Sequence, residues 1–222
     1  MLAWTTMLST GPRGGATPQV IGPPLAALAL LGVLFAVLLV VLWLVFARLR
    51  KYAQQSDAAA LPLGLVGRRH FRGRAYDGTH AGRPVHLLEL PPRRYSTSLL
   101  GVTIVARTRG KASVSPSSGG SAIGDLLMGE SFALGPGLGG HSGRADDPSR
   151  LHALLALPGL RERVQRIAGD GHVTSYLLFR PGHVEVRAMG MVYADWLGSE
   201  GSLRARLDDL AIIAEAAERV GL

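Results

Sequence analysis

The residues that could perform chemistry are scattered along this chain, and the Gly-rich stretch after residue 115 is the first to examine. A P-loop needs GxxxxGK followed by Ser or Thr, because its amides cradle phosphates while the Lys meets their charge. Here Gly119, Gly120 and Gly124 are followed by Asp125, which has the wrong charge. No βαβ pattern surrounds these glycines, so the GxGxxG dinucleotide signature also fails. We interpret the stretch as a loop.

A second near-match concerns serine hydrolysis. The nucleophile elbow Gly-x-Ser-x-Gly sits on a strand-to-helix turn. The segment Gly140–Arg144 reads GHSGR, with Arg in the place of the final glycine. No strong strand pattern precedes it, so Ser142 is interpreted as a loop serine rather than a nucleophile.

Metal ligands would have to come from His and carboxylates, because the chain has no cysteine. The absence of cysteine also excludes disulfides, iron–sulfur clusters and thiol catalysis. His141, Asp146, Asp147 and His152 form the one local cluster with acids. Acids favour the first turn of a helix, and capping is the simpler interpretation of this pair. The sequence therefore predicts no catalytic residue, no cofactor, no cofactor-binding residue and no metal ligand.

Basic residues give a stronger signal than any of these motifs. Residues 62–114 carry ten Lys or Arg against two acids, which by itself equals the net charge of +8 for the whole chain. The candidate membrane-facing basic patch consists of Arg48, Arg50, Lys51, Arg68, Arg69, Arg72 and Arg74. Such a patch is attracted to anionic lipid headgroups. The alternative is ordinary solvated arginines in an Arg-rich bacterial proteome, and nucleic acid binding is disfavoured because few aromatic side chains accompany the patch.

The element that positions this patch is the segment Leu25–Ala47, which has 23 residues and no charge. A helix rises about 1.5 Å per residue, so this one spans roughly 35 Å and can cross a hydrocarbon core of about 30 Å. Residues 1–24 are predicted to be a flexible tail. A cleaved signal peptide fits poorly, because its apolar region is shorter and follows a basic start.

Orientation follows from the flanking charges. Arg48, Arg50 and Lys51 follow the apolar segment, whereas Arg13 alone precedes it. Positive residues remain cytoplasmic. We therefore expect a single-pass protein of the bacterial inner membrane with its N-terminus outside and its C-terminal domain in the cytoplasm.

After the predicted membrane helix, residues 48–61 are expected to form a juxtamembrane helix, and 62–222 an α+β domain. Strands are expected at His70–Tyr76, Pro84–Leu90, Leu99–Arg107 and Lys111–Val114, with a turn at Asp77-Gly78. These form an antiparallel meander. The Ser/Gly-rich segment 115–147 is expected to be a largely irregular loop.

Helices and a hairpin complete the predicted domain. Asp147 is expected to cap a helix over 148–168 that Pro158 divides. Val173–Arg180 and His183–Met189 form a hairpin around Pro181-Gly182. Leu203–Val220 is an amphipathic helix with Ser199 or Ser202 as its N-cap. The predicted architecture has helices packed on one face of the sheet.

The sequence favours a non-enzymatic, membrane-tethered interaction module over a specific activity. Tyr193, Trp196 and Leu197 are candidate partner-binding residues, because Trp and Tyr are enriched at interfaces. The alternative for these three is core packing. An accessory subunit of a larger bacterial membrane complex, of respiratory or photosynthetic type, is the second hypothesis. A membrane-bound enzyme with an unrecognised site is the third. The lipid bilayer and an unidentified protein are the expected partners.

Overall fold

The chain is described by a computed structural model that divides into two compact units, Met1–Phe46 and Ala47–Leu222. The described residues are 25–71, 73–90, 98–116, 130–135, 138, 140–168, 173–190 and 196–222. The predicted tail at residues 1–24 lies outside them.

The first unit holds the apolar part of helix α1 (Leu25–Ala60). Its large apolar side chains from Leu28 to Phe46 are between 43% and 68% exposed. Among the described residues, this is the one helix long and apolar enough to cross a membrane. The predicted apolar helix near the N-terminus is confirmed as a candidate membrane anchor, whereas its orientation and the bacterial inner membrane stay predictions.

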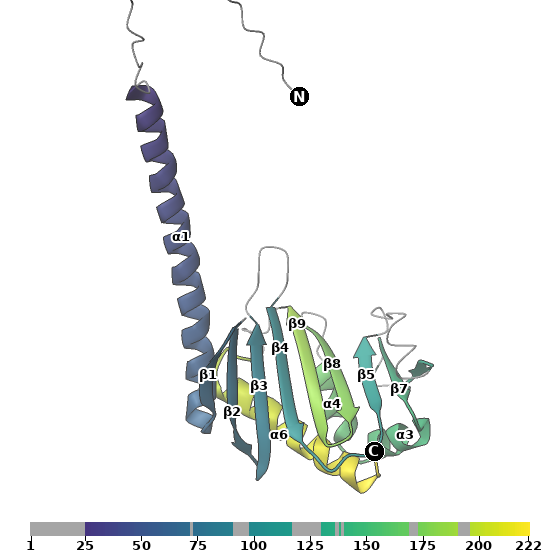
Figure 1. Cartoon of the computed structure of the whole chain (residues 1–222). Helices are drawn as coiled ribbons and strands as arrows, with labels where there is room; N and C mark the ends of the chain where they lie inside the picture. Colours follow the sequence, from purple (N-terminus) through teal and green to yellow (C-terminus); the bar gives the residue numbers. More distant parts are fainter. Residues whose placement is uncertain are drawn as a thin grey trace, which may run out of the picture. The chain divides into compact units, whose positions relative to one another are not determined.

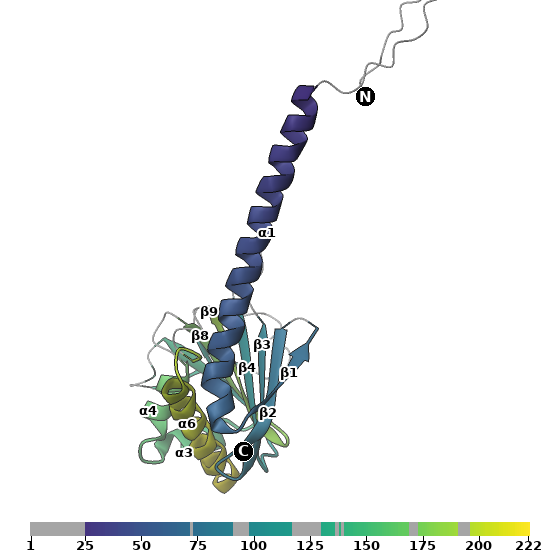
Figure 2. The ribbon, with the colours of Figure 1, turned by 90° about the vertical axis from the view of Figure 1, so that its left-hand side faces the viewer.

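In the described part of the second unit, nine strands form one antiparallel sheet. The strands are β1 (Val66–His70), β2 (Gly73–His80), β3 (Arg83–Leu90), β4 (Ser98–Val105), β5 (Ala112–Pro116), β6 (Phe132–Ala133), β7 (His141–Ala145), β8 (Val173–Arg180) and β9 (His183–Gly190). Helices α3 (Pro148–Ala156), α4 (Leu160–Ala168) and α6 (Glu200–Arg219) cover one face of the sheet, and the short 3₁₀ helix η1 (Leu61–Leu63) follows α1 (Figures 1 and 2). The predicted apolar helix and antiparallel sheet domain with helices are therefore observed.

Strands β2, β3 and β4 lie near the first three predicted strands and pair in sequence as a meander, which β1 extends. The fourth predicted strand, Lys111–Val114, corresponds to β5, which pairs with β7 and β8 rather than with β4, so its place in the meander is wrong. One predicted turn is also wrong. Asp77-Gly78 lies inside β2, and the chain turns instead at Ala81 and Gly82, which both have positive φ. A Cβ on Gly78 would lie 2.7 Å from Leu65 Cδ2. Gly78 is therefore used for a close approach of the chain that precedes β1, rather than for a turn.

The hairpin of β8 and β9 is inserted into the middle of the sheet. β9 pairs with β4, and β8 pairs with β5, so the order is β1-β2-β3-β4-β9-β8-β5-β7-β6. The predicted alternation holds, because Val184, Val186 and Ala188 are fully buried. Their neighbours on the strand point to the opposite face of the sheet, as the period of two requires.

Helix boundaries follow the predicted capping residues closely. The Asp147 carboxylate accepts a hydrogen bond from Ser149 N at 3.0 Å, and α3 and α4 are separated at Pro158. Ser199 caps α6 by accepting from Ser202 N at 3.1 Å. Members of the predicted apolar stripe of α6 are buried: Leu203, Leu207, Leu210, Ala211, Ala214 and Ala217.

The start of the second unit differs from the predicted boundary at residue 62. Residues 47–60 of α1 belong to this unit, and Ser56, Ala59 and Ala60 are fully buried in it. Small side chains at these positions let the helix approach the rest of the domain closely. Residues 48–61 are thus part of the folded domain rather than only a connection to it.

The Ser/Gly-rich segment is more ordered than predicted. Ser115 and Pro116 complete β5, and β7 pairs with β5 along five residues. A Cβ on Gly143 would lie 2.5 Å from Leu134 Cδ2, so glycine permits Leu134 and Phe132 to pack over this strand. The expectation of an irregular loop over 141–145 is therefore wrong, and residues 117–129 lie outside the described part.

Candidate functional site

The structure shows where the residues of the hydrolase and metal candidates lie. Ser142 lies within β7, paired with Ser115 on one side and Ala133 on the other, and not on a strand-to-helix elbow. Asp147 caps α3 and forms an ion pair with Arg150 at 3.1 Å. Within the described ranges, no group of three or more His, Asp or Glu is arranged to hold a metal ion. The Gly119–Asp125 segment lies outside those ranges.

The candidate partner-binding cluster is not at the surface. Trp196 and Leu197 are each 1% exposed and belong to the hydrophobic core, with the Arg206 guanidinium 5.6 Å from the centre of the Trp196 ring. Tyr193 lies outside the described residues. Core packing, the alternative interpretation, accounts for Trp196 and Leu197. Aromatic side chains such as Trp196 bury more apolar surface than other residue types and so dominate a core.

The basic patch is the candidate that retains exposed side chains. Arg48, Arg50 and Lys51 are exposed on the part of α1 within the second unit, and Arg48 donates to the Tyr52 hydroxyl at 3.2 Å. Arg68 and Arg69 are exposed on β1, and the Arg68 side chain, 73% exposed, lies 3.5 Å from Asp77. Arg72 lies outside the described residues.

Arg74 is the member of the patch that the structure assigns elsewhere. Its guanidinium forms an ion pair with Asp57 of α1 and donates to Ala53 O at 3.4 Å. The Tyr76 hydroxyl donates to the same Asp57 carboxylate at 2.9 Å. Arg74 is also the register partner of Glu89, which is 2% exposed. Arg74 is thus paired with an acid and its side chain is 32% exposed, whereas its membrane-facing role stays a prediction.

The pKa values of this group reflect its pairing. The hydrogen bond to Asp57 raises the pKa of Arg74 above its ordinary value. Burial is the main cause that raises the pKa of Tyr76, whose side chain is fully buried. Both residues therefore keep their protons at any physiological pH, and the Asp57–Arg74–Tyr76 group holds α1 against β2.

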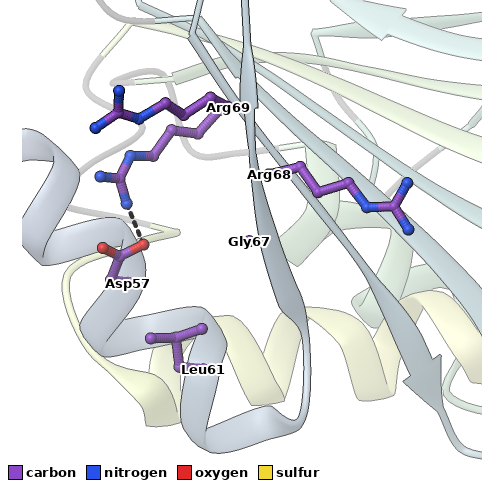
Figure 3. A pocket seen from close by; sticks show the side chains of 6 residues that line it. Asp57, Leu61, Gly67, Arg68 and Arg69 are labelled. Carbon is purple, nitrogen blue, oxygen red and sulfur yellow. Dashed lines mark hydrogen bonds and ion pairs between the residues drawn. The ribbon is translucent and has the colours of Figure 1, made fainter.

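A hollow of about 260 Å³ opens beside this group (Figure 3). It is lined by Asp57, Leu61, Gly67, Arg68, Arg69 and Arg74. Figure 3 shows that Arg69 extends to the side of α1, while Arg68 extends to the opposite side of β1. Arg69 and Arg74 are register partners on neighbouring strands. Two cations directly opposite each other repel. Asp57 and Glu89 flank Arg74 and offset its charge, so the exposed Arg68 and Arg69 are the basic side chains of this hollow that remain at the surface.

A second hollow, of about 150 Å³, lies where the β1–β2 hairpin meets α1. It is lined by Leu49, Tyr52, Ala53, Gly73, Arg74 and Glu89. Leu49 of α1 is 42% exposed and Leu61 of η1 is 52% exposed, so one apolar side chain is only partly covered at each hollow. Nothing in the sequence signalled these two hollows, because both arise where α1 packs against a hairpin.

Two acids that sequence reasoning missed, one buried and one partly exposed, connect α6 to the rest of the domain. Asp209 is 5% exposed and accepts from Arg163 at 2.5 Å and Arg166 at 2.8 Å. Burial opposes its charge, but these hydrogen bonds are sufficient to lower the pKa of Asp209. Glu218 accepts from both Nη atoms of Arg83, at 2.7 and 2.9 Å. An acid on the apolar side of a helix is the sequence signal that could have identified Asp209.

By fold, this is a chain with one candidate membrane-spanning helix and one α+β domain built on an antiparallel sheet. No protein-family model and no curated protein matches the sequence. Among solved structures, the chain is similar to the crystal structure of the mycobacterial trehalose monomycolate transport factor A, TtfA. The identity is 11% and the TM-score 0.49, over 77% of this chain and 94% of that one. A likeness this distant assigns no function to the chain.

Proposed function

We propose that this protein is a single-pass membrane protein whose α+β domain acts as a non-enzymatic interaction module at the cytoplasmic face of a bacterial inner membrane. The observation that carries the proposal is the exposure of α1. Its large apolar side chains from Leu28 to Phe46 are at least 43% exposed. A helix that is apolar all round requires an apolar solvent, and lipid supplies one.

The charge distribution supports the proposed orientation. Arg48, Arg50 and Lys51 are exposed and follow the apolar stretch directly. Basic residues close to the end of a membrane helix remain on the cytoplasmic side during insertion. The domain, which begins at Ala47, is then cytoplasmic, and the residues before Leu25 are outside.

The proposal of a non-enzymatic role rests on how the ionisable groups of the domain are used. Asp57 binds Arg74 and Tyr76, Glu218 binds Arg83, and Asp209 binds two arginines. Each of these groups connects one element of the fold to another. An acid or base used in catalysis must instead reach a substrate.

Membrane fractionation of the full chain tests the anchor. We expect the protein to remain in the membrane pellet after an alkaline carbonate wash. Replacing Leu38 and Val41 together with Arg places two charges at the centre of the apolar run, at about 2.5–3.5 kcal/mol each, and should release the protein. Ile212→Arg, on the partly exposed face of α6, is the matched control and should stay in the pellet. Release of the unaltered chain by carbonate would refute the proposal.

A blue-native gel of detergent-solubilised membranes distinguishes the interaction module from the accessory-subunit hypothesis. A band near the size of the monomer, or a mixture of sizes that changes with detergent, is expected of a module with a reversible partner. One discrete, detergent-stable large band would instead favour a permanent subunit of a larger complex.

A further inference from the structure

The tip of the β1–β2 hairpin carries the most exposed large apolar side chain in the described part of the chain. Phe71 is 85% exposed, against 62% for Val66 at the other end of β1. Its ring lies 6.2 Å from that of His70, centre to centre, in a tilted arrangement. A single exposed apolar side chain is common on protein surfaces, so the meaning of this ring depends on the residues around it.

The hairpin runs alongside the part of α1 that belongs to the second unit. A Cβ on Gly67, near the start of β1, would lie 3.9 Å from the Asp57 carboxylate. Gly73, at the other end of the hairpin connection, lines a hollow together with Leu49. Along the hairpin from Gly67 to its tip, the neighbouring residues of α1 therefore change from Asp57 to Leu49. All of these residues belong to the second unit.

Chain length limits how far this tip can lie from a bilayer. Leu49 follows Phe46 by three residues, which span at most about 11 Å whatever the angle between the two units. The headgroup layer on each side of a bilayer is roughly 5–8 Å thick. With Phe46 at the end of the hydrocarbon core, the headgroup layer is therefore within reach of Leu49.

The charges around the tip are those that an anionic headgroup layer attracts. Arg68 and Arg69 are exposed on β1, and Arg50 and Lys51 are exposed on the adjacent turn of α1. An aromatic ring flanked by basic side chains matches the composition of segments that lie in the membrane interface.

From these observations we infer that the β1–β2 hairpin tip is a second membrane contact, in which Phe71 enters the headgroup layer while Arg68 and Arg69 bind lipid phosphates. This inference rests on the proposed function, because α1 must first be in the bilayer. Two points of attachment, α1 and the tip, fix the rotation of the domain about the helix axis. The domain then presents one constant side to a partner.

The absence of cysteine makes a direct test practical, since a single introduced thiol is labelled without background. Phe71→Cys carries an environment-sensitive NBD fluorophore, and the full chain is reconstituted into nanodiscs of either phosphatidylcholine alone or phosphatidylcholine with phosphatidylglycerol. Val66→Cys is the matched control, because Val66 is exposed at the end of β1 away from the hairpin tip. We expect a blue shift and a several-fold rise in emission at position 71 in the anionic discs, with little change at position 66.

A second variant tests the basic side chains. Arg69→Gln should reduce the emission change at position 71. Arg204→Gln, at an exposed position of α6, should leave that change unaltered. Equal, water-like emission from positions 71 and 66 in correctly reconstituted protein would overturn the inference and leave the anchor intact. A blue shift that appears only on native membranes and never on pure lipid would also overturn it, in favour of a protein partner. Failure of the chain to enter nanodiscs at all would instead refute the proposed function, and the inference with it.

Discussion

Replacing Glu218 with Gln is the sharpest test of how the domain is held together. The Glu218 carboxylate accepts two hydrogen bonds from the Arg83 guanidinium, at 2.7 and 2.9 Å, and one from Arg107 N at 2.6 Å. It thereby ties the C-terminal end of α6 to β3 and to the chain that leaves β4. Gln has nearly the shape of the protonated acid, so the substitution measures the contribution of the charge.

The expected loss of stability in Glu218→Gln follows from the pKa of Glu218. The hydrogen bonds from Arg83 are the main cause that lowers the pKa of Glu218 from 4.5 to about 2. At about 1.36 kcal/mol per unit, this difference corresponds to roughly 3 kcal/mol of unfolding free energy. The side chain is 22% exposed, so solvent screening reduces the expected loss to about 2 kcal/mol.

The pH dependence has a definite sign. A carboxyl whose pKa is lower in the folded state stabilises the fold fully above its unfolded pKa and loses that contribution as the pH falls. The difference in stability between the unaltered chain and Glu218→Gln should therefore be constant above about pH 5.5. It should decrease as the pH falls below 4.5 and vanish near pH 2.

The assay is urea unfolding of the full chain in detergent, followed by the fluorescence of buried Trp196 in a background where Trp4 and Trp43 are replaced by Phe. Glu215→Gln is the matched control, because Glu215 lies three residues earlier on α6, is 53% exposed and forms an ion pair with Arg219. An exposed pair of this kind contributes about 0.5 kcal/mol or less. Equal losses for Glu218→Gln and Glu215→Gln would refute the reasoning.

Three further predictions concern packing, a buried charge and topology. Gly78→Ala should lower the free energy of unfolding by about 1–3 kcal/mol, because its Cβ would clash with Leu65, whereas Gly101→Ala, with no atom nearer than 3.9 Å, should change urea unfolding little. Asp209→Asn should lower the thermal midpoint of unfolding, because it leaves two arginines without their carboxylate. The expected loss of unfolding free energy is about 1.5–3 kcal/mol. Replacing the three basic residues directly after the apolar run with Gln should leave a fraction of the molecules inserted in the opposite orientation. In these molecules a C-terminal tag would be sensitive to protease added to spheroplasts. Complete protection of the tag would contradict the charge argument.

Local signals predicted the elements of this protein well. The apolar run, the Asp147 and Ser199 caps, the break at Pro158 and the hairpin turn at Pro181-Gly182 are all observed close to their predicted positions. Each depends on interactions within a few residues, which is why the sequence is sufficient. The Asp77-Gly78 turn failed because Gly78 is required for contact with Leu65, a residue thirteen positions earlier.

The residues of the candidate site divide in the same way. The exposure of Arg48, Arg50 and Lys51 could be anticipated from their place after an apolar helix. Sequence could not predict that Arg74 pairs with Asp57 and Tyr76, or that Trp196 is buried. Both depend on which elements pack together.

By itself, the sequence determined that one helix needs an apolar solvent, and that the chain following it is basic and divides into strands and amphipathic helices. Hydrophobic content and charge act residue by residue, so they can be read without a fold. Only the tertiary structure decided that the β8–β9 hairpin enters the sheet between β4 and β5, that residues 47–60 join the domain, and that Gly73 lines a hollow with Leu49. These depend on which surfaces of distant segments bury each other best, and that is a property of the whole chain.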